Sequence, residues 1–299
     1  MNNSRKLISC ITASISLGIL GFTAQAADIS LLNNNTSGED WNTAADWSNN
    51  ESPSAANNYF VDARILRTPD VNNNSSTPVV FGGNSLTLQN TASASQDGRL
   101  ALKANFTTVN ALTMSGGEIF NSGPNGGGSF AQVNVGNLTI EDVNNVYGGT
   151  TARNVYLFVG SLTGSGDLSF GLSGDSSLVY GLSAVANNPF TGTINAGASA
   201  FRLRGDVNIS NGSFWLGEST VLNLESGSLA VASASFILEN SELTLTDGTY
   251  SAADLNTFFG TSQFEGEGLL YVGVNIPEPG SAAMVLGCVA LLLLVRRRR

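Results

Sequence analysis

The stretch Val135-Gly136-Asn137-Leu138-Thr139-Ile140 decides the fold of this chain, because close copies of it recur along the sequence. The other clear copies are Gly83–Leu88, Val109–Met114 and Val159–Gly164. Their shared Leu-Thr pair begins at Leu86, Leu112, Leu138 and Leu162, so the intervals are 26, 26 and 24 residues. A nearly fixed period in the twenties, built from β-prone runs and turn residues, is typical of repeat proteins whose coils stack on one another.

Within each copy, the order of residues is that of a strand with one buried side. Successive side chains of a strand face opposite sides, so Leu138 and Ile140 would point inward while Thr139 points outward. Glycine between the strands allows turns with positive φ, and asparagine allows ladders of stacked side chains. We therefore expect each repeat to place a Leu-x-Leu or Leu-x-Ile strand against a common core.

Looser copies extend the pattern toward the C-terminus. They are Val221–Leu224 and Glu242–Leu245, with Leu222 and Leu243 in equivalent places 21 residues apart. The sequence therefore predicts an all-β fold, a right-handed parallel β-helix or β-solenoid, over residues 79–275. The cysteines are Cys10 and Cys288, both in the apolar terminal segments, so no disulfide would stabilise this region.

A further motif lies in the same region. Phe190-Thr191-Gly192-Thr193-Ile194-Asn195-Ala196-Gly197 resembles the repeat of autotransporter-type β-helix passengers, and Gly164-Ser165-Gly166-Asp167-Leu168 resembles the turn that precedes that repeat. The likeness covers residues 162–224. It implies the passenger architecture, although no translocating barrel sequence follows here.

The Asn-rich stretch 27–78 is predicted to form a cap at one end of the stack. It contains Trp41 and Trp47, which in a polar stretch need something to cover. We expect them to cover the end of the core; the alternative is an aromatic platform for a sugar.

At the other end, Ser251–Gly260 is predicted to be a short capping helix. Ser251 would be its N-cap, Asp254 lies in the first turn and Gly260 would end it. Leu255, Phe258 and Phe259 are expected on one face of this helix.

The N-terminal segment 1–26 reads as a secretory signal peptide. Arg5 and Lys6 precede an apolar, hydroxyl-rich stretch, Leu7–Phe22. Ala24-Gln25-Ala26 has the small-x-small pattern of a cleavage site, so Ala24 and Ala26 are the predicted cleavage residues. Export through the Sec machinery would leave a mature chain that begins at Ala27 or Asp28.

The C-terminal segment 276–299 contains three parts in a fixed order. Pro277, Glu278 and Pro279 form a rigid tripeptide, and Gly280–Val295 is an uncharged run that we expect to be a short transmembrane helix. Four cations end the chain, and they would stay cytoplasmic: Arg296, Arg297, Arg298 and Arg299.

This order resembles the PEP-CTERM sorting signal of Gram-negative bacteria. The resemblance implies that an exosortase, a membrane protease-transferase, cuts near the Pro-Glu-Pro motif. The protein would be anchored in the inner membrane only transiently and would then reach the cell surface or the extracellular polymer matrix.

Charge and composition limit the partners. Six of the 13 basic residues lie in the terminal segments, which leaves 13 − 6 = 7 against 23 acidic residues, a balance of −16. Such a surface repels nucleic acid. The chain has no histidine, which removes His-based nucleophile pairs and His-ligated zinc. We expect no cofactor and no strong metal site.

Several short motifs are weak candidates for binding sites. Arg204-Gly205-Asp206 is an RGD tripeptide, and Gly164-x-Gly166-Asp167-x-Ser169 is similar to a single calcium-binding nonapeptide turn. Three acidic pairs could hold calcium weakly: Glu39-Asp40, Glu141-Asp142 and Glu265 with Glu267. Arg202 and Arg204 would share one face and could pair with Asp206 or with carboxylates on neighbouring coils.

These observations favour an exported structural or adhesive protein of the cell surface or extracellular matrix, with no catalytic residues predicted. The alternative is a β-helix protein that binds or cleaves polysaccharide, since extracellular polysaccharide is a natural partner at that location and β-helix lyases do not need histidine.

Overall fold

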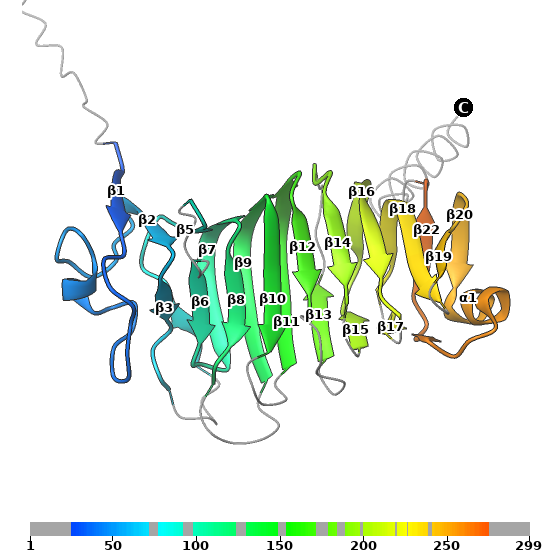
Figure 1. Cartoon of the computed structure of the whole chain (residues 1–299), viewed down its shortest axis with the longest axis horizontal. Coiled ribbons are helices and arrows are strands. Elements are labelled where there is room, and N and C mark those ends of the chain that lie inside the picture. Colours follow the sequence, from blue (N-terminus) through cyan, green and yellow to red (C-terminus); the bar gives the residue numbers. More distant parts are fainter. Residues whose placement is uncertain are drawn as a thin grey trace, which may run out of the picture.

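The structure is a computed structural model, and it describes residues 25–71, 77–91, 98–123, 130–148, 154–171, 179–183, 189–197, 200–218, 220–225, 227–238 and 241–274. The fold is all-β with two large, mostly parallel sheets and one short α-helix. The strands stack side by side along the long axis of the molecule, from β1 at one end to α1 at the other (Figure 1).

The first sheet has eleven strands. In spatial order they are β1 (Ala27–Ser30), β2 (Asn57–Asp62), β5 (Ser85–Gln89), β7 (Phe106–Ser115), β9 (Phe130–Glu141), β11 (Asn154–Gly164), β13 (Val179–Ser183), β15 (Ala200–Leu203), β17 (Val221–Asn223) and β21 (Phe264–Glu265), with β4 (Val79–Val80) beside β7.

The second sheet also has eleven strands. Their order is β3 (Ile65–Arg67), β6 (Arg99–Leu102), β8 (Glu118–Asn121), β10 (Val143–Gly148), β12 (Asp167–Phe170), β14 (Thr193–Ala196), β16 (Val207–Leu216), β18 (Leu229–Leu238), β22 (Leu269–Val272) and β20 (Gly248–Ser251), with β19 (Ser241–Thr244) beside β18.

From β5 to β18 the chain alternates between the sheets at every strand, and each return adds a strand parallel to the previous one. The repeat leucines fall in register. Leu86 pairs with Leu112, Leu112 with Leu138, and Leu138 with Leu162. All four side chains are buried in one continuous core. The predicted leucine column is therefore confirmed.

The last copy of the repeat is different. Leu222 is buried in β17 as expected, but Leu243 lies in β19, in the other sheet, and is 42% exposed. β19 runs antiparallel to β18, so the predicted equivalence of Leu222 and Leu243 is wrong. A four-residue run with alternate leucines fits a parallel or an antiparallel strand equally well.

The long strands of the first sheet bend at one residue. In β7 the buried positions Val109 and Leu112 are separated by two outward residues, so the in-out alternation shifts by one there. The corresponding residues in β9 and β11 are Gly136 and Gly160. A Cβ on Gly136 would lie 2.6 Å from the oxygen of Asn110, which explains the glycine at this bend. The bend divides the first sheet into two faces.

The N-terminal end of the stack is covered by residues 31–56 together with the 3₁₀-helix η1 (Ala44–Asp46). Trp41 and Trp47 are fully buried, and the Trp47 ring packs edge-on against Tyr59 with centroids 4.9 Å apart. Asn34 and Asn35 complete the edge of β3, because their side-chain oxygens accept hydrogen bonds from the backbone of Ile65 and Arg67 (both 2.8 Å). The tryptophans cover the core, as expected, and do not form a sugar platform.

The C-terminal end is covered by α1 (Ala252–Phe259), as the sequence predicted. Ser251 and Asp254 form a capping box, and Gly260 ends the helix with φ of 64°. Leu255 is buried, but Phe258 is 71% exposed, so the expectation that Phe258 joins the inward face is wrong. In a helix, position i+4 lies closer than i+3 to the line through residue i along the helix axis. Phe259 is therefore nearer than Phe258 to the buried face that Leu255 occupies.

Candidate functional site

The terminal motifs lie mostly outside the described residues. This applies to Ala24, to Pro277, Glu278 and Pro279, to the expected helix Gly280–Val295, and to the arginines Arg296–Arg299. Ala26 is described and directly precedes β1. Cleavage after Ala26 would therefore leave the first strand whole. In the part of the chain that the structure describes, no helix combines the length and the apolar character that a membrane span requires.

Glu39 and Glu265, from two of the acidic pairs, are engaged in local bonding. Glu39 Oε2 accepts hydrogen bonds from the Oγ1 and backbone N of Thr36 (2.7 and 2.6 Å), and these bonds hold the pKa of Glu39 below its ordinary value. The Asn223 amide donates to Glu265, while Gly266 (φ 96°) follows at once and ends the alternation that would have placed Glu267 on the same face. Across the described ranges, no three carboxylate or thiol side chains converge as metal ligands would.

The RGD tripeptide is divided between two sets of contacts. The carboxylate of Asp206 accepts a hydrogen bond from the backbone N of Ser228 (2.9 Å), which fixes the turn at Gly205. Arg204 pairs instead with Glu225 (Nε to Oε2, 3.3 Å), and its guanidinium lies 4.3 Å from the ring centroid of Tyr156. The three side chains do not act as one unit.

Arg202 and Arg204 come together around one carboxylate. Arg202 Nη1 lies 3.3 Å from Glu225 Oε1, and Arg204 reaches the other oxygen. Of the two expected kinds of partner, Asp206 or carboxylates on neighbouring coils, the second is confirmed, because the partner is Glu225, which follows β17, while Asp206 bonds to Ser228. All three side chains are about one-third exposed, so the pairs add little to stability and serve mainly to place charge and hydrogen-bond donors on this face.

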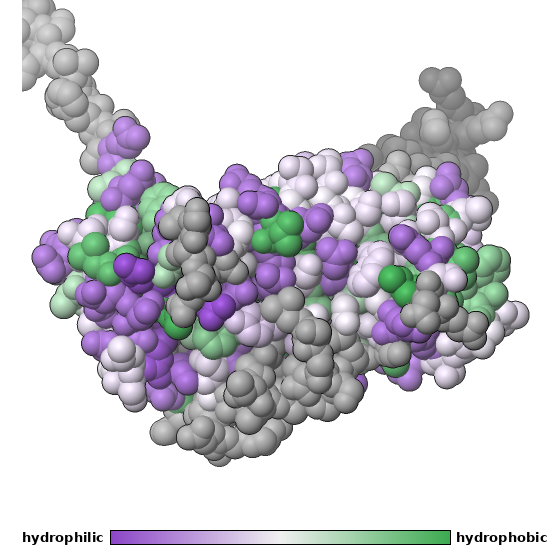
Figure 2. All heavy atoms as spheres, viewed as in Figure 1, coloured by the Kyte–Doolittle hydropathy of each residue, from purple (hydrophilic) through white to green (hydrophobic). Residues whose placement is uncertain are grey.

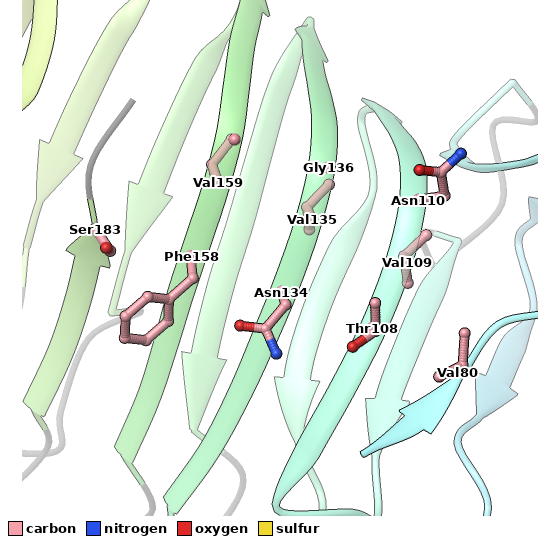
Figure 3. Close-up of a pocket in the computed structure, with 11 residues that line it drawn as sticks. Val80, Thr108, Val109, Asn110, Asn134, Val135, Gly136, Phe158, Val159 and Ser183 are labelled. Atoms are coloured by element: carbon pink, nitrogen blue, oxygen red, sulfur yellow. The ribbon is translucent and has the colours of Figure 1, made fainter. Parts of the chain in front are cut away.

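A hollow lined entirely by described residues lies on the outer side of the first sheet. It has a volume of about 660 Å³ and is lined by Val80, Thr108, Val109, Asn110, Asn134, Val135, Gly136, Phe158, Val159, Gly160 and Ser183. These residues come from β4, β7, β9, β11 and β13 (Figure 3). The lining carries no ionisable side chain, and most of its exposed area is apolar.

The outward side chains in this pocket form a single row. Thr108 pairs with Asn134, Asn134 with Phe158, and Phe158 with Ser183 in consecutive parallel strands. Figure 3 shows the Phe158 ring extending from β11 toward Ser183. The valines Val109, Val135 and Val159 follow these residues in their strands and are buried beneath the bend. The row runs across the strands, along the stack.

A second row of aromatic residues flanks the pocket. Phe106 and Phe130 meet edge-on with centroids 5.5 Å apart, and Phe130 lies 6.1 Å from Tyr156. Arg204 lies against the Tyr156 ring, and Tyr156 is only 6% exposed, so Phe106 and Phe130, both half-buried, are the accessible rings of this row. An aromatic ring presents a flat apolar face, and hydroxyl, amide and guanidinium groups beside it supply hydrogen bonds. Such a surface suits a ligand that has both an apolar face and polar edges.

Sequence reasoning missed this pocket. The Leu-Thr pair that defines the repeat lies beyond the bend and says nothing of the residues before it. The signal was present at Leu157 and Phe158: successive side chains of a strand face opposite sides, so the residue after a buried leucine points outward.

A smaller hollow, of about 560 Å³, lies at the C-terminal end between β18, β19 and α1. Leu243 and Phe258 line it and account for two of the exposed large hydrophobic side chains of the described residues. The others are scattered singly, and the face in Figure 2 shows small hydrophobic areas among hydrophilic ones. Scattered residues of this kind are normal on a protein surface.

Comparison of this chain with protein-family models, with curated proteins and with solved structures finds no match.

Proposed function

We propose that this chain is an exported structural or adhesive protein of the cell surface or extracellular matrix, built as a right-handed parallel β-solenoid. The observation that carries the proposal is the in-register column Leu86, Leu112, Leu138 and Leu162. A column of this kind turns a sequence repeat into an extended scaffold whose length grows with each repeat. Such a scaffold presents long lateral faces, which suits a role in support or adhesion.

Right-handed coiling is supported by general chirality. A strand that crosses over and returns parallel in the same sheet does so with a right-handed connection in about 98% of cases. Here each such connection passes through a strand of the second sheet, for example from β7 through β8 to β9.

Sorting is supported by the order of motifs at the two ends. A predicted signal peptide ending at Ala26 precedes β1, and the sequence pattern that resembles a PEP-CTERM signal follows Val274, the last residue described. The partners under this proposal are the Sec export machinery, an exosortase and, for a time, the inner membrane. The absence of cysteine between Ala27 and Pro279 suits a protein whose fold must form after export without disulfides.

The sorting proposal is tested in cells that make the full chain. Mass spectrometry of surface and matrix material should find C-terminal peptides that end near Ile276–Pro279. A triple variant, Pro277→Ala with Glu278→Ala and Pro279→Ala, should remain in the membrane fraction with its tail intact. Recovery of intact Gly280–Arg299 from the extracellular material of the wild type would contradict the proposal.

A second function, polysaccharide binding, is favoured by one specific observation. The row Thr108, Asn134, Phe158 and Ser183 places an aromatic ring between polar side chains on an open, elongated surface. Because the pocket lining holds no ionisable group, it offers no acid or base for cleavage, and binding is the better-supported form of this alternative.

A further inference from the structure

We infer that the pocket on the outer side of the first sheet binds a neutral polysaccharide, with the polymer lying across β7, β9, β11 and β13 along the row Thr108, Asn134, Phe158 and Ser183. The inference rests on the second proposed function and names its ligand class and residues. It does not depend on how the protein is sorted.

The shape of the row points to a chain-like ligand. Neighbouring strands of a sheet lie about 4.8 Å apart, so the four side chains mark a nearly straight track across the strands. The track is open at the surface. The bend at Asn110, Gly136 and Gly160 forms one wall along the part of the track that crosses β7, β9 and β11, because these residues are equivalent in three successive strands.

Glycine keeps that wall free of side chains in β9 and β11. A Cβ on Gly160 would lie 2.7 Å from the oxygen of Gly136, so the close stacking of the strands at the bend requires glycine there. The consequence on the outer side is that bare backbone borders the row at Gly136 and Gly160, and the Phe158 ring remains accessible beside it.

The chemistry of the lining matches a sugar ring. A pyranose has C–H faces that stack on an aromatic ring and hydroxyl groups around its edge. Phe158 and Val80 provide apolar contact, while Thr108, Asn134 and Ser183 provide hydrogen-bonding groups. The Asn134 Oδ1 accepts a hydrogen bond from Gln132 Nε2 (2.8 Å), which holds the amide in one orientation. A positioned amide favours binding because less side-chain freedom is lost.

Charge selects a neutral polymer over an acidic one. The region between the terminal segments has a balance of −16, so an anionic polysaccharide would be repelled on approach. Arg202 and Arg204, in and after the next strand β15, are already paired with Glu225. The pocket itself adds no positive charge that would offset the repulsion.

A protein partner fits this surface less well. A peptide that extends a sheet needs an unpaired strand edge, whereas the row lies on the flat side of a sheet. A stable protein interface buries about 800 Å² on each partner, yet Val80 is the only strongly exposed large hydrophobic side chain in the lining.

The test uses the exported protein, purified from cells that make the full chain, in native gels cast with a polysaccharide. Hydroxyethylcellulose and konjac glucomannan serve as neutral probes and alginate as the acidic probe. We expect retardation in at least one neutral gel and none in alginate. Phe158→Ala should weaken the apparent affinity about tenfold, as for truncation of a central aromatic contact.

The matched control is Phe120→Ala. Phe120 is half-buried and lies on the second sheet, where it stacks on Tyr147 with centroids 5.7 Å apart. This variant should bind as the wild type does. If Phe158→Ala melts early, Asn134→Ala replaces it, with Asn195→Ala on the second sheet as its control.

Three results would overturn the inference: no retardation in either neutral gel, stronger retardation in alginate, or equal losses in the variant and its control. None of these results bears on sorting, which is measured on the C-terminal peptides in cells.

Discussion

The middle of the stack and its C-terminal end pair their strand edges in different ways. Between β5 and β11 every strand has a parallel neighbour on each side, and the same residue types meet in register, as Leu112 does with Leu86 and Leu138. Beyond β18 the chain adds antiparallel strands, since β19 pairs with β18 and β20 with β22. A last parallel pass is made by β21 on β17 and by β22 on β18, and α1 lies over the end. The interior is held together by repeated parallel pairing, whereas at the end antiparallel strands and a helix prevent a further strand from adding.

The free edge of β21, the last strand of the first sheet, is blocked by a side chain of α1. Asn256 of α1 donates its amide N–H to the oxygen of Phe264 (2.7 Å) and accepts from the backbone N of Phe264 (3.0 Å). One side chain thus occupies the hydrogen-bonding groups that another strand would use. At the opposite end, Asn34 and Asn35 do the same for β3. An edge completed in this way does not recruit a second chain.

The largest expected effect is the difference in lost unfolding free energy between a substitution in the interior and a matched one at the end. Leu138→Asp places a carboxylate in the core, where Leu138 is fully buried, so we expect a loss of more than about 4 kcal/mol in the free energy of unfolding, or no folded protein. Leu243→Asp, the matched change at a 42% exposed leucine, should cost less than about 1 kcal/mol. Thermal and urea unfolding of both variants measure this difference. Equal losses in the free energy of unfolding would contradict the distinction between interior and end.

The sequence was sufficient for the interior and insufficient for the end, for a physical reason. Leu86, Leu112, Leu138 and Leu162 could be predicted because stacking requires equivalent residues at equivalent places, and the period records this directly. Leu243 could not, since strand direction depends on which neighbour offers a free edge, and this is a property of the folded chain.

The same reason applies to the candidate site. Phe158 and Ser183 belong to one row because β11 pairs with β13 through the residues before the bend, Val155–Phe158, whereas its pairing with β9 continues past the bend to Gly164. The Leu-Thr copies lie beyond the bend, so comparing them does not place Phe158 beside Ser183, although strand alternation does turn Phe158 outward. The sorting motif, by contrast, was predicted from sequence order alone and stays a prediction.

A smaller effect is expected at the completed edge. Asn256→Ala removes both hydrogen bonds to Phe264, leaving a backbone N–H and C=O without these partners. We expect a loss of about 1–3 kcal/mol in the free energy of unfolding. The exposed edge of β21 should also promote association, seen as a concentration-dependent increase in size by light scattering. As a control, Thr257→Ala removes one exposed bond within α1 and should leave the protein monodisperse.

The smallest effect is expected from pH at the start of α1. The hydrogen bonds from the Ser251 side chain and backbone to the Asp254 carboxylate hold the pKa of Asp254 below its ordinary value. The folded state therefore gains stability while Asp254 is ionised, and this gain is complete at pH values above the ordinary pKa of an aspartate. That gain disappears as the pH falls through the lowered pKa.

The Asp254→Asn variant should lose the part of the pH dependence that Asp254 supplies. The difference in melting temperature between the wild type and this variant should shrink on acidification. A difference that stays constant from neutral to strongly acidic pH would show that the capping carboxylate does not contribute in this way.

The parallel stacking of the repeat is tested most directly by cross-linking. Thr87 and Thr113 are register partners in β5 and β7, one position after the leucine column, and both are half-buried on the outer side. Partners in neighbouring strands lie about 4.8 Å apart, within the range that a disulfide spans. Thr139 occupies the same place one strand further on.

Cysteines at Thr87 and Thr113, in a chain with Cys10→Ser and Cys288→Ser, should form a disulfide on mild oxidation, detected by mass spectrometry of proteolytic peptides. Cysteines at Thr87 and Thr139, two strands apart, should remain reduced. This pattern is the result that the stacked repeat predicts. Failure of the first pair to react, or equal reaction of both pairs, would contradict it.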